Sequence, residues 1–355
     1  MFIFTQYKYE FLISNYMKKI LPVKYPVITG HPSTAGLFSI LGNYEKTKEW
    51  IYSNYIQIAV GIRNGNIFAG GSIDTIILPA YHAEKTCPYI IHSLLTRDTV
   101  MAINKNILEF AVKMIDTENY LYLVADQQYF IDVHKFPCPH DMFIYGYDLE
   151  DEMLYAADFT FSDSVKYTYK EISMYKFKAG YEAIADKDDF HYYERGGVGL
   201  FHFDVNACYV FDIDFVKEQI REFVSSIDYS ECFRSTDNPF VQREYGLRAY
   251  DLLSSFLRDD KEQCWGGRKS LAVLCDHKKL MVARLQYMIK GGYINNYNLL
   301  AEYEDMYNNQ ERLLLLFIKY EATKNCKYRE KVAAELELIK LREKDCLIEL
   351  LNELS

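Results

Sequence analysis

A histidine and an aspartate in one predicted β-hairpin are the residues of this chain best placed to do chemistry. The segment HDMFIYGYD is followed by LE and then by DEMLYAADF, so two alternating strands flank a short turn. A two-residue loop would pair Asp148 with Asp151. In that register His140 falls opposite Asp158 or its neighbour Phe159. A carboxylate there would orient an imidazole and stabilise its positive charge, as a general base requires, although a solvated histidine at a strand edge has the same sequence pattern.

The stretch VITGHPSTAGLFSILGNY, from Val27 to Tyr44, has the pattern of a helix that could carry a nucleophile. Ser33 or Thr34 is expected to cap this helix, whose apolar residues then follow at helical spacing. A side chain in its first turn would feel exposed backbone N–H groups and the positive end of the helix dipole, which stabilise a thiolate. The stretch contains no cysteine.

These two segments resemble the papain-like fold. The residues TAGLFS align with the Ser-Cys-Trp-Ala-Phe-Ser pattern that opens the central helix of that superfamily, with Ala35 at the cysteine position and Phe38 and Ser39 in step. The pair AG is similar to the Cys-Gly start of the double-glycine peptidases, and HDMFIYGYDLEDEMLYAADF is similar to their histidine strand. The order of the parts most resembles the family of the butirosin-biosynthesis H protein, whose relatives include the papain-like amide synthetase of closthioamide biosynthesis.

The resemblance implies an α+β, papain-like fold, in which a central helix packs on an antiparallel sheet, followed by a large C-terminal α-helical region. It implies a Cys-His-Asp triad at Ala35, His140 and Asp158, with Thr34, Ser33 and His31 near the oxyanion. Members of the family transfer an acyl group from a carrier-protein thioester to an amine in specialised, nonribosomal-peptide-like biosynthesis. The implied partners are an acyl or peptidyl carrier protein and a small amine. No cofactor or metal of its own is implied, because phosphopantetheine arrives on the carrier protein.

Ala35 departs from this pattern because its methyl group is not a nucleophile. Three explanations are open: the chain is a Cys→Ala variant made to trap a complex, Ser33 or Thr34 serves instead, or the chain is a catalytically inactive relative that binds or scaffolds a partner. The first is favoured, because a rotation of about 100° per helical residue would point Ser33 and Thr34 away from His140. A double-glycine peptidase is a third function, disfavoured because no transporter domain accompanies the segment.

Other polar and thiol groups are weaker candidates. Asp126 and Gln127 end the predicted strand NYLYLVAD and are candidates for substrate binding, although a polar strand end is the simpler interpretation. Cys87 and Cys138 each precede a proline and are alternative thiols, but neither opens a helix. Buried, unreactive cysteines are more common.

The apolar periodicity of the sequence changes near residue 205. Before it, β-branched and aromatic runs such as IAVGIR alternate with turn residues, whereas the later part has the longer period of helices. We therefore expect two domains, a papain-like α+β region over residues 1–204 and an α-helical region over residues 205–355 packed against it. RGGVG is expected to be a turn between them, and KGGYINN a helix stop followed by a reversal.

Composition limits the classes of partner. The 355 residues include 40 basic and 50 acidic side chains, a net charge of −10, so a nucleic-acid partner is not expected. There is no apolar run of about 18 residues, and the eight cysteines are scattered, which favours a cytoplasmic protein with reduced thiols and no membrane partner. An acidic carrier protein would need a local basic patch, for which Lys278 and Lys279 are the candidates.

Overall fold

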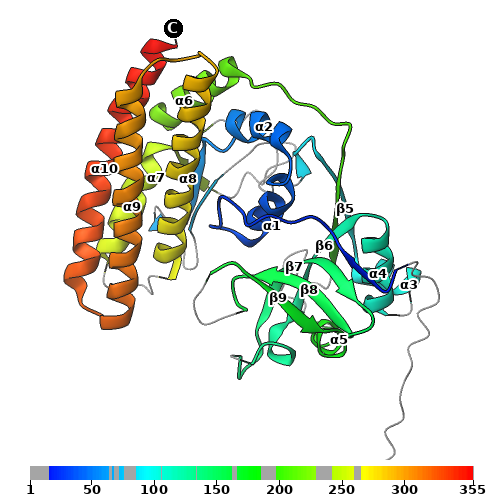
Figure 1. Cartoon of the computed structure of the whole chain (residues 1–355). Coiled ribbons are helices and arrows are strands. Elements are labelled where there is room, and N and C mark those ends of the chain that lie inside the picture. Colours follow the sequence, from blue (N-terminus) through cyan, green and yellow to red (C-terminus); the bar gives the residue numbers. More distant parts are fainter. Residues whose placement is uncertain are drawn as a thin grey trace, which may run out of the picture. The chain divides into compact units, whose positions relative to one another are not determined.

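The structure is a computed structural model that describes residues 16–63, 66–67, 72–75, 85–104, 106–132, 134–161, 166–184, 197–228, 242–259 and 265–354. The fold is α+β, with antiparallel sheets and a large C-terminal helical region (Figure 1). The chain forms two compact units. We call them the sheet unit, which comprises the residues up to Lys24 and Ile90–Val205, and the helical unit, which comprises Tyr25–Tyr89 and Asn206–Ser355.

This division corrects the expected domains. A boundary does fall beside residue 205, but the expected first domain, residues 1–204, is not one unit, because Tyr25–Tyr89 belongs with the helices. The reason is a long-range strand pairing: Ile58–Arg63 lies antiparallel to Gln242–Tyr245, far along the chain. Short-range sequence patterns carry no signal of such a partner.

The described strands of the sheet unit form one antiparallel sheet in the order β5-β10-β6-β7-β8-β9, and β1 also pairs with β7. Strand β10 lies inside this sheet, so the expected turn at RGGVG is wrong for Val198 and Gly199; residues 195 and 196 lie outside the described residues. The strands are β1 (Lys18–Ile20), β5 (Ile90–Leu95), β6 (Asn119–Asp126), β7 (Pro139–Asp148), β8 (Met153–Asp158), β9 (Thr168–Ser173) and β10 (Val198–Phe203).

The hairpin of β7 and β8 forms as expected but in a different register. Asp148 pairs with Met153 rather than Asp151, so the turn is longer than two residues. The cause is the Asp148 side chain, whose Oδ1 accepts the backbone N–H groups of Glu150 and Asp151 at 3.1 and 3.2 Å and so closes a wider turn. A bulge after Ile144 shifts the pairing once more.

Helices also occur in the sheet unit, where mainly strands were expected. They are α3 (Arg97–Ile103), α4 (Ile107–Asp116) and α5 (Met174–Glu182), with a short 3-10 turn, η3 (Gln127–Tyr129), after β6. Helix α4 has a complete local signal: the Asn106 side chain accepts the N–H of Glu109 at 3.0 Å, and Glu109 pairs with Lys113 one turn later at 2.7 Å. Both α4 and α5 pack against β6.

The first part of the helical unit combines short helices with a small sheet. Strand β2 carries β11 on one edge and β3 and β4 on the other. The elements are α1 (Pro32–Leu41), η1 (Glu45–Thr47), α2 (Lys48–Ser53), β2 (Ile58–Arg63), β3 (Asn66–Ile67), β4 (Ile73–Thr75) and β11 (Gln242–Tyr245).

The second part of the helical unit is a set of long helices, as expected. They are α6 (Ile213–Ser225), α7 (Leu247–Arg258), α8 (Trp265–Lys290), α9 (Tyr297–Thr323) and α10 (Cys326–Glu353). The predicted stop at KGGYINN separates α8 from α9, and Gly292 there adopts a φ of 74°, a conformation that favours glycine. Helices α8, α9 and α10 then lie side by side (Figure 1).

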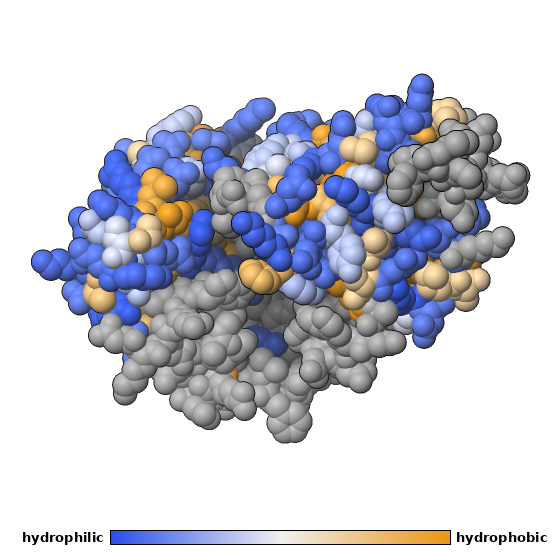
Figure 2. Space-filling view, turned by 90° about the horizontal axis from the view of Figure 1, so that it is seen from below, coloured by the Kyte–Doolittle hydropathy of each residue, from blue (hydrophilic) through white to orange (hydrophobic). Residues whose placement is uncertain are grey.

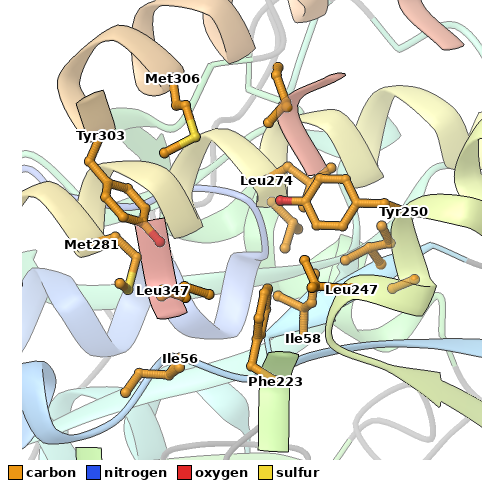
Figure 3. Close-up of a cluster of buried hydrophobic side chains, with 14 of the residues drawn as sticks. Ile56, Ile58, Phe223, Leu247, Tyr250, Leu274, Met281, Tyr303, Met306 and Leu347 are labelled. Carbon is orange, nitrogen blue, oxygen red and sulfur yellow. The ribbon is translucent and has the colours of Figure 1, made fainter. Parts of the chain in front are cut away.

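A buried apolar cluster joins the two chain segments of the helical unit (Figure 3). Ile58 from β2 lies in it together with Phe223 from α6 and Leu247 from α7. Full burial of one such aliphatic side chain contributes about 1.5–3 kcal/mol. The cluster therefore holds the early strand and the late helices together. Its other labelled members are Ile56, Tyr250, Leu274, Met281, Tyr303, Met306 and Leu347.

An ion pair lies inside this unit, and it corrects the predicted basic patch. Lys278 Nζ is 2.6 Å from Glu343 Oε1, and both residues have no exposed side-chain surface. The Tyr250 hydroxyl accepts from Lys278 and donates to Glu343 Oε2 at 2.8 Å. Burial lowers the pKa of Lys278, while Glu343 opposes that effect. The prediction that Lys278 forms part of a docking patch is therefore wrong. Lys279 is exposed.

Candidate active site

The predicted contact between His140 and Asp158 is present. His140 Nδ1 lies 2.7 Å from Asp158 Oδ2; the Asp158 side chain is completely buried, and that of His140 is 30% exposed. Asp141 Oδ1 is also 3.4 Å from the same nitrogen. Two carboxylates thus stand beside one imidazole, which stabilises its protonated form. A hydrogen on Nδ1 leaves Nε2 as the nitrogen that can accept a proton.

The pair meets where three neighbouring strands begin or end. In the antiparallel sheet, the end of β6 lies beside the start of β7, with Ala125 opposite His140, and β8 ends on the other side of β7. Phe143 pairs with Ala157, and this register does not place His140 directly opposite Asp158. The predicted direct pairing of the two residues is therefore wrong. His140 instead reaches Asp158 diagonally, which is possible because alternate residues of a strand share a face.

The Asp158 carboxylate is held by more than the imidazole. Oδ2 accepts from Gln127 Nε2 at 2.6 Å, and the Thr160 hydroxyl lies 2.6 Å from the same oxygen. Oδ1 accepts the N–H of Phe159 at 2.6 Å. Because a buried carboxyl group is costly unless it is hydrogen-bonded, these donors fix the orientation of Asp158. The orientation of the His140 ring follows from that of Asp158.

The two residues predicted to bind substrate have structural partners. Gln127 is fully buried, and its amide bonds both Asp158 and the Thr160 hydroxyl, the latter at 2.5 Å. Asp126 Oδ1 accepts the N–H groups of Gln128 and Cys138 at 3.1 and 2.9 Å and so closes the loop between β6 and β7. In the described structure both side chains support the His–Asp pair, and a role in binding substrate stays a prediction.

Thr160 was not identified from the sequence, although a signal was present. It follows Asp158 by two residues, and alternation along a strand places such residues on one face. Its hydroxyl has one hydrogen, which serves either Asp158 or the Gln127 carbonyl oxygen. The Thr160 carbonyl also bonds His134 Nε2 at 2.8 Å. Thr160 therefore connects the end of β8 to the loop that carries Gln127.

The alternative thiols do not have the surroundings of a nucleophile. Burial, together with the nearby charges of Asp126 and Asp158, raises the pKa of Cys138, so its thiol stays protonated. Cys87 is 3% exposed. Both features are typical of unreactive cysteines.

Helix α1 begins earlier than expected. It starts at Pro32, a residue suited to the first helical position, and His31 occupies the N-cap with extended backbone. Ser33 and Thr34 thus lie inside the helix, and their predicted capping role is wrong. The Ser33 hydroxyl lies 3.0 Å from His31 Nδ1. Ala35 is in the first turn, as expected, and is fully buried.

The backbone N–H groups of this first turn differ in their hydrogen bonding. The N–H of Ala35 donates to the His31 carbonyl at 2.9 Å, the first hydrogen bond of the helix. It is therefore committed to the helix, whereas the N–H groups of Ser33 and Thr34 precede the helical ladder. Ala35 belongs to the helical unit, and His140 and Asp158 belong to the sheet unit. The convergence of the three on one site stays a prediction.

The described residues include neither a metal-ligand cluster nor a membrane-spanning helix. Over the described ranges, no group of three or more His, Cys, Asp or Glu side chains is arranged to hold a metal ion. Within the same part of the chain, none of the helices combines the length and the apolar character that crossing a membrane demands. Figure 2 shows one face of the molecule, where apolar residues occur in separate patches among hydrophilic ones.

A scan against protein-family models finds no family that matches the chain, and a search of curated proteins finds no match.

Proposed function

We propose that the protein has the papain-like architecture of an acyltransferase, which moves an acyl group from a carrier-protein thioester to an amine. The observation that carries the proposal is the buried Asp158 carboxylate, which binds His140 Nδ1 at 2.7 Å and is itself fixed by Gln127 and Thr160. A histidine oriented in this way is a general base that needs only a nucleophile beside Nε2. The proposal assigns that nucleophile to a cysteine at position 35.

The reaction has two steps, each balanced in protons. In the first, the thiol at position 35 gives its proton to His140, and the thiolate attacks the thioester carbonyl. The carbon–sulfur bond to the pantetheine arm breaks, and His140 returns the proton to that leaving thiolate. In the second, an amine attacks the acyl carbonyl carbon and gives a proton to His140; the amide bond forms as the bond between that carbon and the sulfur of residue 35 breaks, and His140 returns the proton to the sulfur. Asp158 keeps the ring in one tautomer and stabilises its positive charge throughout.

The start of α1 supplies the remaining requirement. The tetrahedral intermediate of each step carries a negative oxygen, and the N–H groups of Ser33 and Thr34 lie ahead of the helical hydrogen-bond ladder. Ala35 has no exposed surface. A cysteine at this position would be shielded from bulk water.

The proposal is tested by restoring the nucleophile. We call the Ala35→Cys chain the thiol variant. It is incubated with an acyl N-acetylcysteamine thioester, and the intact protein and its peptides are weighed by mass spectrometry. We expect a mass increase equal to the acyl group at residue 35, followed by loss of that mass and release of an amide when an amine is added.

Three matched controls make the result specific. The original Ala35 chain should gain no mass; an adduct on Ser33 or Thr34 there would assign the nucleophile to a hydroxyl. In the thiol variant, His140→Ala should abolish the adduct, and Asp158→Asn should slow it about 10³- to 10⁴-fold, because the ring then takes the wrong tautomer. Absence of any adduct in the thiol variant would refute acyl transfer. Cleavage of a Gly-Gly leader peptide would instead assign a peptidase.

A second function is favoured by Ala35 itself, which provides no nucleophilic atom. The chain as it stands would then be a binding or scaffold protein that retains an inactive papain-like site. This alternative predicts that the thiol variant forms no adduct, while the unmodified chain still binds an acylated carrier protein in titration calorimetry. An adduct at residue 35 would exclude it.

A further inference from the structure

A carboxylate of α8 holds the segment that leads into α1. Asp276 Oδ2 accepts the backbone N–H of Thr29 at 2.7 Å and also that of Gly30, a residue 246 positions away in the sequence. Both contacts lie within the helical unit. Two consecutive backbone donors on one oxygen fix the path of the chain at this point, because moving either residue breaks a hydrogen bond.

The segment is also pressed against α8. A Cβ atom placed on Gly30 would lie 2.9 Å from Asp276 Oδ2, 2.9 Å from Val273 Cγ2 and 3.2 Å from Val273 Cα. The last of these is backbone and cannot rotate away. A side chain at position 30 would therefore displace Val273 or Asp276, and glycine is the residue that permits this close approach.

Rigid links connect this contact to position 35. Pro32 fixes its own φ and begins α1 two residues after Gly30, and the His31 carbonyl accepts the N–H of Ala35 at 2.9 Å. The Ser39 hydroxyl in turn donates to the Ala35 carbonyl at 2.8 Å. A displacement of Gly30 would therefore also move the first turn of α1, which contains residue 35.

The charge of Asp276 is not needed for this contact. Burial raises the pKa of Asp276 to about 7, while the N–H groups of Gly30 and Thr29, and Lys279 on the same helix, lower it. Tyr307 and Glu311 are the titratable groups on α9 near this part of α8, and His31 is the one on the segment it holds. A neutral side chain with an oxygen in the same place would accept the same two donors.

We propose that Asp276 is the positioning residue of the acyl-transfer site, because its contact with Thr29 and Gly30 sets where residue 35 stands. This inference rests on the proposed function. Misplacement of a reacting group by about 1 Å can cost about 100-fold in rate, so loss of the contact should impair chemistry more than substrate binding.

The test compares two substitutions of Asp276 in the thiol variant. Asp276→Asn keeps an accepting oxygen, and Asp276→Leu has a similar size but accepts nothing. For Asp276→Leu we expect kcat for amide formation to fall about 30- to 100-fold with KM changed less than threefold. Asp276→Asn should stay within threefold of the parent. Lys290→Ala, an exposed change at the end of the same helix, is the matched control and should leave both constants unchanged.

Amide hydrogen exchange reports the contact without any catalysis. In Asp276→Leu the N–H groups of Thr29 and Gly30 should exchange at least tenfold faster, and in Asp276→Asn they should not. If Asp276→Leu does not fold, Gly30→Ala tests the same contact and should lower kcat in the same way. Unchanged kcat in a folded Asp276→Leu protein, or equal losses in both variants, would overturn the inference.

Failure of the proposed function is recognised separately. If the thiol variant forms no adduct, alkylation of residue 35 by iodoacetamide is followed by peptide mass spectrometry, with the exposed Cys208 as internal reference. Residue 35 is fully buried, so displacement of the first turn should expose it: Asp276→Leu should raise the alkylation rate of residue 35 at least tenfold and change that of Cys208 less than twofold. Equal rates in parent and variant would refute positioning by Asp276 on their own.

Discussion

Replacing Lys278 by methionine should destabilise the protein strongly, whereas the same change at Lys279 should not. The two lysines are neighbours on α8, but Lys278 is fully buried and Lys279 is exposed. In Lys278→Met, the buried Glu343 loses a cation 2.6 Å away and keeps the Tyr250 hydroxyl. Glu343 would then remain a buried charge without a cation, because burial lowers the pKa of His277, whose Nδ1 lies 3.6 Å from Glu343 Oε1, well below its usual value.

The magnitude follows from that buried charge. Removing one partner of a buried ion pair costs about 3–5 kcal/mol, of which methionine returns part by filling the space. We expect about 3 kcal/mol, which is about 150-fold in the unfolding equilibrium at about 1.4 kcal/mol per tenfold. An exposed substitution such as Lys279→Met stays within about 0.5 kcal/mol.

Urea unfolding, followed by far-ultraviolet circular dichroism under reducing conditions, measures both free energies. Adding Glu343→Gln to Lys278→Met should recover at least half of the loss, because the amide removes the isolated charge and its oxygen still accepts from Tyr250. A loss below about 1 kcal/mol for Lys278→Met, or equal losses for the two lysine variants, would refute the buried pair.

The remaining predictions concern the neighbours of Asp158 and the Asp276 carboxyl group. Thr160→Val in the thiol variant should slow adduct formation about tenfold, because Asp158 loses a hydroxyl neighbour; an unchanged rate would remove Thr160 from the network. Cys138→Ala should leave that rate unchanged, since the pKa of this thiol is raised, and a large loss would identify Cys138 as the nucleophile. The Asp276 pKa lies near 7 in the folded protein, above its ordinary value of 3.8, so its contribution to stability should decline as pH rises from about 4 to 7. The decline in the free energy of unfolding should be about 2 kcal/mol after allowance for partial exposure, and Asp276→Asn should abolish it. Thermal melts at pH 5 and pH 8 measure this effect. An equal shift of the melting temperature between the two pH values in both proteins would contradict it.

Local patterns predicted the elements that depend on neighbours in the sequence. IAVGIR corresponds to β2, Ile58–Arg63, and the long helices after residue 205 follow their apolar period. The His140–Asp158 contact also survived an error in the hairpin register. Side chains of this length reach diagonal neighbours on a sheet face, so a shift of one or two residues did not separate them.

Features that depend on distant partners were not predictable in this way. Lys278 has the charge of a surface residue, and only Glu343, 65 residues later on another helix, makes it part of the interior. The role of Asp276 likewise depends on its hydrogen bonds with Thr29 and Gly30, which are far away in the sequence. Strand β11 is short, and its pairing with β2 connects the segment Tyr25–Tyr89 to the helical unit.

The interleaved chain order of the two units has a consequence for biosynthesis. Ribosomes add about 5–20 residues per second, so the 246 residues between Gly30 and Asp276 take on the order of 10–50 s to emerge. During that interval the late helices that complete the helical unit are not yet synthesised. The stretch from Tyr25 to Tyr89, which includes an apolar strand, therefore lacks its packing partners. The continuous stretch from Ile90 to Val205 is available to fold sooner. A nascent chain of this kind is a natural client for chaperones that shield apolar segments during translation.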